Sequence, residues 1–146
     1  MKRICLNISV ILMLLATSFL IVSFPAAGKD MTVKELVEEA KTGIRTISAA
    51  EANSMFGKSG VVFLDVREPD EYKAGHIPGA VNIPRGLLES RIEEQVPDRN
   101  TDLVVYCRSG VRSALASATL VKMGYKGVLN MDGGWKTWQE AGYPAE

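Results

Sequence analysis

Residues 104–113 read VVYCRSGVRS and hold the most informative pattern in this 146-residue chain. An apolar run typical of a buried strand leads into Cys107, a short loop with a glycine and two arginines follows, and a helix is expected from Val111 onward. The amino end of a helix and neighbouring cations both favour the thiolate, which is the nucleophilic form of cysteine. The segment therefore predicts a nucleophilic cysteine at a strand–loop–helix junction.

The same loop has the composition of a site that binds anions. Backbone N–H groups ahead of a helix can converge on an anion, and the forked donors of arginine suit an oxyanion. A glycine in such a loop permits a left-handed turn or a close approach of the backbone. Without this loop, an inert core cysteine would be the preferred interpretation. The candidate binding residues directly follow the cysteine and are Arg108, Ser109, Gly110, Val111 and Arg112.

Strands and helices are expected to alternate along the rest of the chain. Short apolar runs predict strands at residues 44–47, 61–66, 80–83, 103–106 and 128–131. Capping boxes predict helices after Thr32 and Ser48, and further helical segments are expected at 68–71, 87–96, 111–123 and 134–141. This alternation predicts an α/β fold with a central, mainly parallel five-stranded sheet and helices on both faces.

On the helix expected at 111–123, apolar side chains recur on one face, which is predicted to lie against the sheet. They are Val111, Ala114, Leu115, Ala118 and Val121. Ligands of parallel sheets bind beyond the carboxyl ends of the strands, where Asp65 and Cys107 are both expected. Asp65 could orient loop groups and Arg67 could add positive field, but a structural ion pair or a contact at a helix start is the preferred interpretation.

The amino-terminal residues 1–27 have the pattern of a secretory signal peptide, with Lys2 and Arg3 ahead of an apolar run and small residues before Gly28. An uncleaved membrane anchor is the alternative, because residues 4–24 are 21 positions without a charge. In either case the protein is expected in the periplasm or otherwise exported. The predicted organisation is a leader at 1–27, a helical segment at 28–43 and one domain at 44–146.

Composition argues against several classes of partner. The chain has 17 basic and 17 acidic residues, and the sequence shows no clustered basic surface of the kind that binds nucleic acid. Cys5 lies in the predicted leader, so Cys107 would be the lone thiol of a mature chain and could form no internal disulfide. That cysteine and the single histidine, His76, cannot complete a closed zinc shell. Neither a metal nor a cofactor is expected.

Four short segments occur in the order and spacing of one enzyme family. They are LDVRE at 64–68, GHIPGAVNI at 75–83, CRSGVRS at 107–113 and GGW at 133–135. Together they resemble the single-domain rhodaneses, which are thiosulfate-type sulfurtransferases. The resemblance covers residues 44–143 and implies a rhodanese-like fold. It also implies that Cys107 takes a sulfane sulfur from thiosulfate or a similar small anionic donor as a persulfide, and passes it to cyanide or a thiol.

The resemblance also assigns roles around the cysteine. Backbone amides from Arg108 to Arg112 would hold the outer sulfur, the side chains of these two arginines would orient the donor, and Asp65 would brace the site. His76, in a turn motif, is expected to be scaffold rather than a base. Trp135 and Trp138, three residues apart, are expected in the core, with GGW shaping one wall of the pocket.

Two other functions compete with sulfur transfer to a small acceptor. One is a sulfur-carrier module that delivers persulfide sulfur to a protein thiol. The other is a phosphatase or arsenate reductase, whose loop in related proteins is one residue longer; the four residues between Cys107 and Arg112 favour sulfur. All of these interpretations would fail if the sulfur were buried away from solvent and the nearby amides faced elsewhere.

Overall fold

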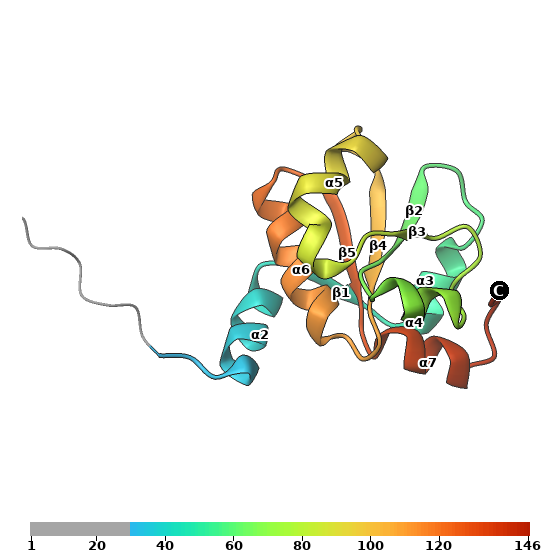
Figure 1. Cartoon of the computed structure of the whole chain (residues 1–146), viewed down its shortest axis with the longest axis horizontal. Helices are drawn as coiled ribbons and strands as arrows, with labels where there is room; N and C mark the ends of the chain where they lie inside the picture. Colours follow the sequence, from blue (N-terminus) through green and yellow to red (C-terminus); the bar gives the residue numbers. More distant parts are fainter. Residues whose placement is uncertain (1–29) are drawn as a thin grey trace, which may run out of the picture. The chain divides into compact units, whose positions relative to one another are not determined.

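A five-stranded parallel sheet forms the centre of the computed structural model, which describes residues 30–146 (Figure 1). The strands lie in the order β1-β5-β4-β2-β3, and every neighbouring pair is parallel. Their bounds are Arg45–Ile47 for β1, Val61–Asp65 for β2, Val81–Asn82 for β3, Asp102–Tyr106 for β4 and Gly127–Met131 for β5. The predicted fold class is therefore confirmed, with a sheet that is wholly rather than mainly parallel.

Helices cover both faces of this sheet. Buried side chains of α5 and α6 pack on one face, and those of α3 and α7 pack on the other. The helices are α2 (Val33–Thr42), α3 (Ala49–Met55), α4 (Pro69–Lys73), the short 3₁₀ helix η1 (Arg85–Leu87), α5 (Leu88–Gln95), α6 (Val111–Lys122) and α7 (Gly134–Glu140). The chain divides into two units, residues 1–30 and 31–146, and all of these elements belong to the second.

Local sequence signals account for where several helices begin. The predicted capping boxes at Thr32 and Ser48 are both present. Each hydroxyl accepts a hydrogen bond from the backbone N–H of the glutamate three residues later, and the carboxylate of that glutamate accepts one from the backbone N–H of the capping residue. Pro69 occupies the first turn of α4, where its missing N–H costs no hydrogen bond. These caps place the start of each helix within a residue of its expected position.

Residues 103–106 of the central strand β4 are continuously apolar because both of their faces are covered. Leu103 and Val105 face the cluster formed with α5 and α6, whereas Val104 and Tyr106 face the cluster that contains Trp135 and Trp138. Because both faces of a central parallel strand are covered, no position can be left polar for solvent. The expectation that both tryptophans lie in the core is confirmed, since their exposed fractions are 7% and 0%.

Of the predicted sheet-facing side of α6, only Ala114 is fully buried, and the rest of the prediction is wrong. Val111 and Val121 remain 43% and 41% exposed, and Leu115 and Ala118 border a groove shared with α2. The fully enclosed side chains of this helix are instead mostly small, namely Ser113, Ala114, Ala116, Ser117 and Leu120. Helix α2 packs on α6, so α6 has two covered sides, and the apolar stripe marks the side nearer α2.

The predicted leader, residues 1–27, lies outside the described residues. Of the helical segment expected at 28–43, the structure describes residues 30–43, which contain α2. Within the described part of the chain, no helix has both the length and the apolar character that crossing a bilayer requires.

Candidate active site around Cys107

The sheet order brings three loops to one rim. Strands β2 and β4 are neighbours, with Asp65 opposite Tyr106, and β5 lies on the other side of β4. Since all strands are parallel, the segments that follow them emerge at the same edge. Cys107 follows β4 directly, helix α4 follows β2, and the glycine pair 133–134 follows β5.

The sulfur of Cys107 lies inside its own loop, against the amino end of α6. The N–H of Gly110 donates to Sγ at 3.2 Å, and Gly110 caps the helix with a left-handed φ of 97°. An N–H directed at sulfur is the kind of contact that stabilises an anion. The first-turn amides of α6, at Val111 and Arg112, have no acceptor within their own helix. The Gly110 N–H therefore faces the sulfur, as the sequence requires of the loop amides.

Access to the sulfur is narrower than the sequence suggests. Cys107 is only 1% exposed, whereas the next two residues, Arg108 and Ser109, are exposed. The expectation that a loop amide faces the sulfur is met by Gly110, whereas the expectation that the sulfur is not buried away from solvent is wrong. The buried sulfur is therefore shielded from bulk water.

Helix α7 holds the loop from the opposite side. The N–H of Trp135 donates to the carbonyl of Cys107 at 2.7 Å, and the N–H of Lys136 donates to the carbonyl of Arg108 at 3.1 Å. Because the N–H and C=O of a trans peptide point in opposite directions, the amides of Arg108 and Ser109 are turned away from α7. The GGW motif, expected to shape a wall, thus anchors the loop through its backbone.

Replacement of Gly134 by alanine tests this anchoring. Gly134 has a φ of +60°, and a Cβ there would overlap the carbonyl oxygen of Cys107. We expect the free energy of unfolding to fall by about 2 kcal/mol, because the loop must shift. Gly57→Ala is the matched control, since Gly57 has a φ of +73° with open space around it. Equal effects of both substitutions in urea unfolding would contradict the close approach.

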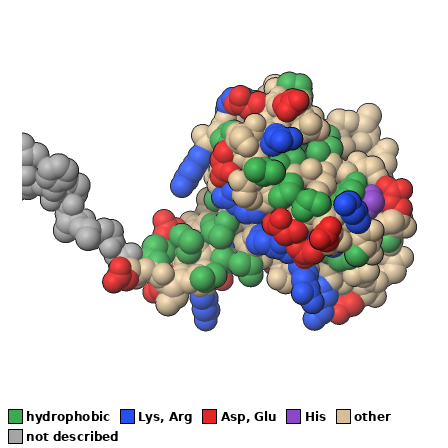
Figure 2. All heavy atoms as spheres, in the orientation of Figure 1, with side chains coloured by type: hydrophobic (Ala, Val, Ile, Leu, Met, Phe, Trp, Pro, Cys, Tyr) green, Lys and Arg blue, Asp and Glu red, His purple; other side chains and the backbone are tan. Residues whose placement is uncertain are grey.

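The two loop arginines differ in their surroundings. Arg112 donates from Nη1 and Nη2 to the two carboxylate oxygens of Glu71, at 2.7 and 2.8 Å. Arg108 is exposed, and no acceptor for its guanidinium is found among residues 30–146. Acidic side chains over α4 lie beside basic ones over the amino end of α6 (Figure 2). Of the two expected donor-orienting side chains, Arg108 is free to meet a ligand and Arg112 is already paired.

Glu71 is the site residue that sequence reasoning missed. The hydrogen bond from Arg112 is the main cause that lowers the pKa of Glu71 to about 2, so this carboxyl is ionised at neutral pH. The hydrogen bond to this carboxylate raises the pKa of Arg112, and the charge of Cys107 adds to that rise. The available signal was the position of Glu71 in the first turn after a strand, but its partner follows only from the β2–β4 pairing.

Asp65 and Arg67 form a buried ion pair. The two side chains are 0% and 3% exposed, with Nη2 of Arg67 at 2.6 Å from Oδ2 of Asp65. Burial lowers the pKa of Arg67, but the hydrogen bond and charge of Asp65 outweigh it and raise that pKa. The preferred interpretation, a structural ion pair, is confirmed, although the pair is enclosed rather than exposed. With its charge matched by Asp65, Arg67 contributes little free positive field.

The Asp65–Arg67 ion pair contacts residues next to the cysteine loop. The guanidinium of Arg67 lies over the rings of Trp135 and Tyr106, with its central carbon 5.0 and 5.7 Å from their centroids. It also donates to the carbonyl of Gly75 at 2.8 Å. Arg67 therefore contacts the helix that anchors the cysteine loop, which agrees with a bracing role for the pair.

His76 belongs to the scaffold, as expected. Its ring stacks on Tyr72 at 3.6 Å between centroids, one ring nitrogen lies 3.1 Å from a carboxylate oxygen of Glu146, and its backbone exchanges two hydrogen bonds with the backbone of Glu146. These contacts fix the end of the described chain to the turn that precedes β3.

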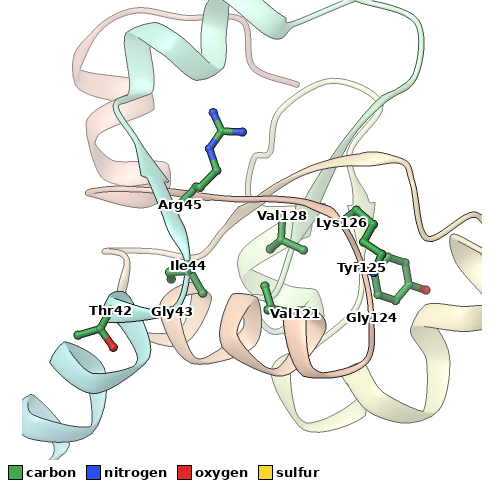
Figure 3. Close-up of a pocket in the computed structure, with 9 residues that line it drawn as sticks. All are labelled: Thr42, Gly43, Ile44, Arg45, Val121, Gly124, Tyr125, Lys126 and Val128. Atoms are coloured by element: carbon green, nitrogen blue, oxygen red, sulfur yellow. The ribbon is translucent and has the colours of Figure 1, made fainter.

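A cavity of about 520 Å³ lies at the other end of the sheet (Figure 3). It is bordered by the starts of β1 and β5 and by the end of α6, with Val121, Tyr125 and Val128 among its lining residues. None of the predicted site residues lines it. The predicted site residues therefore lie away from this cavity, toward the carboxyl ends of the strands.

Comparisons with known proteins agree with this geometry. Residues 48–141 match the family of rhodanese-like domains. A sulfurtransferase of Allochromatium vinosum is 44% identical over 84 residues, which cover 58% of this chain and 77% of that protein. The thiosulfate sulfurtransferase GlpE of Pseudoalteromonas translucida is 33% identical over 100 residues, covering 65% of this chain and 89% of the relative.

A solved structure from Rhodopseudomonas palustris, named as a protein of unknown function and possible tyrosine phosphatase, is also similar. It is 36% identical with a TM-score of 0.74, and the match covers 84% of this chain and all of that one. The strand–loop–helix site, the match over residues 48–141 and these relatives all point to the same family. The chain belongs to the rhodanese-like sulfurtransferase family.

Proposed function

We propose that this protein transfers a sulfane sulfur through a persulfide on Cys107. The observation that carries the proposal is the Gly110 N–H directed at Sγ from the amino end of α6. In the first step the Cys107 thiolate attacks the outer sulfur of thiosulfate. The S–S bond of the donor breaks, and sulfite leaves with the bonding electron pair. The persulfide that remains carries its negative charge on the outer sulfur, where backbone N–H groups of the loop can stabilise it.

The second step returns the cysteine to its starting state. A nucleophilic acceptor, cyanide or a thiol, attacks the outer sulfur, and the Cys107 thiolate is the leaving group. With cyanide the product is thiocyanate. The exposed guanidinium of Arg108 is suited to attracting an anionic donor to the loop, because it has no competing acceptor in the described part of the chain. The leader-like residues 1–27 support a site of action outside the cytoplasm.

Loop length favours sulfur over phosphorus as the transferred element. Four residues separate Cys107 from Arg112, and the sulfur is closely enclosed by its own loop, with Gly110 N–H at 3.2 Å. A tetrahedral oxyanion needs a wider ring of amides around the nucleophile. The phosphatase label of the Rhodopseudomonas palustris protein therefore carries less weight for this chain than the sulfurtransferase relatives do.

Mass spectrometry tests the proposal directly. Purified protein incubated with thiosulfate should gain the mass of one sulfur atom on the peptide that contains Cys107, and cyanide should remove it with formation of thiocyanate. A protein thiol acceptor would be indicated if discharge to cyanide and small thiols were slow while a partner protein took the sulfur rapidly. Lack of any gain on Cys107, or Cys107-dependent release of phosphate from an aryl phosphate, would contradict sulfur transfer.

A further inference from the structure

The contact between Glu71 and Arg112 occupies the part of the arginine that would bind a donor. Both terminal nitrogens of Arg112 face Glu71, one on each carboxylate oxygen. A sulfonate or carboxylate ligand would ordinarily use the same two-pronged arrangement. The two side chains are 33% and 31% exposed, so the pair lies at the surface of the site rather than within the core.

Glu71 is held in this position by its own helix. Its Oε2 accepts from the backbone N–H of Glu68 at 3.2 Å, at the start of α4. The strand order places α4 next to the cysteine loop, so the contact is built into the fold. A carboxyl whose pKa is about 2 is not released from the arginine by protonation at neutral pH. A ligand that needs Arg112 must therefore compete with a fixed carboxylate.

We infer that Glu71 is a specificity-determining residue that acts through Arg112 and disfavours donors that carry an oxyanion group. Thiosulfate presents a sulfonate that competes with Glu71 for the arginine. The persulfide of a small thiol without a carboxylate, such as 2-mercaptoethanol persulfide, carries no oxyanion group. The inference rests on the proposed function and narrows its donor class to thiol persulfides over thiosulfate.

The chemistry is balanced for either donor. The Cys107 thiolate attacks the outer sulfur, the donor's S–S bond breaks, and the bonding pair leaves on sulfite from thiosulfate or on a thiolate from a thiol persulfide. The persulfide proton, where one is present, stays with the transferred sulfur. No further oxidant or reductant is needed. Only the leaving group differs, and only sulfite is an oxyanion.

Steady-state kinetics of Glu71→Gln with both donors tests this inference. Glutamine keeps the size of the side chain and an acceptor for the Glu68 N–H but removes the charge that competes for Arg112. We expect KM for thiosulfate to fall about fivefold, the scale of a partly exposed ion pair. KM for 2-mercaptoethanol persulfide and kcat with either donor should change by less than about twofold, because neither depends on freeing Arg112.

Asp70→Asn is the matched control. Asp70 is exposed in the same turn of α4, and its side chain takes no part in the contact with Arg112. Removing its charge should leave both KM values within about twofold of the wild type. An equal fall in KM for thiosulfate in both variants would mean that general charge, not the Arg112 contact, sets the preference, and would overturn the inference.

The remaining outcomes separate this inference from the proposed function. An unchanged or higher KM for thiosulfate in Glu71→Gln would show that Glu71 does not compete with the donor, while sulfur transfer through Cys107 would still stand. Equal falls in KM for both donors would likewise overturn the discrimination. Failure of the wild-type protein to accept sulfur from either donor would remove the proposed function and the inference together.

Discussion

Replacement of Cys107 by serine is expected to abolish sulfur transfer, lowering kcat by more than about a thousandfold. A serine hydroxyl is almost un-ionised at neutral pH, and the loop that stabilises a sulfur anion cannot compensate for the much weaker acid. The measurements are thiocyanate formation from thiosulfate and cyanide, and the intact mass of the protein after exposure to thiosulfate. The variant should show neither product nor added sulfur.

The same variant separates lost chemistry from lost structure. A serine oxygen can accept the Gly110 N–H that now reaches Sγ, and the change in side-chain volume is small, so the free energy of unfolding should change by less than about 1.5 kcal/mol. The sequence contains one other cysteine, Cys5. Transfer at the wild-type rate by a folded Cys107→Ser protein would assign the reaction to another group and would sink the persulfide mechanism.

The fold could be predicted because the strands and helix caps have local causes. Residues 61–64 of β2 and 103–106 of β4 form continuous apolar runs since helices cover both sides of these central strands. The capping boxes at Thr32 and Ser48 depend only on residues three positions apart. Such signals lie within one element, so they can be read without knowledge of what packs against it.

The buried side of α6 could not be predicted from periodicity. Its enclosed residues include Ser113 and Ser117, which a hydrophobic pattern scores as surface. Small side chains let the helix approach the sheet closely, whereas the larger Val111 and Val121 stay partly exposed. Whether a stripe faces the sheet or a second helix depends on α2, which lies far away in the sequence.

The candidate site likewise has a part that the sequence predicts and a part that it does not. The sequence predicts the adjacency of Cys107 and Gly110 because they share one loop, and the structure places the Gly110 N–H on the sulfur. The pairing of Glu71 with Arg112 joins segments 41 residues apart and depends on the order of β2 and β4 in the sheet. That order is a tertiary property, since neither segment has a pattern that specifies its neighbour.

Replacement of Asp65 by asparagine is expected to be among the most destabilising single changes at this rim, lowering the free energy of unfolding by about 3–5 kcal/mol. Arg67 is 3% exposed and Asp65 is fully buried, so the variant leaves a cation in the interior without its counter-charge. A domain of this size is typically stable by only about 5–15 kcal/mol. Urea unfolding followed by tryptophan fluorescence would measure the loss.

Two further variants decide whether the unmatched charge is the cause. Glu89→Gln removes the acid of the exposed Arg85–Glu89 pair, whose side chains are 29% and 50% exposed, and should cost less than about 1 kcal/mol. The double variant Asp65→Asn with Arg67→Met removes both buried charges and should recover part of the stability lost by Asp65→Asn alone. If Asp65→Asn cost no more than Glu89→Gln, the buried pair would not brace the rim. Sulfur loading of Cys107 should fall most in the variant that loses most stability, because the Arg67 guanidinium packs on the ring of Trp135, whose N–H donates to the carbonyl of Cys107.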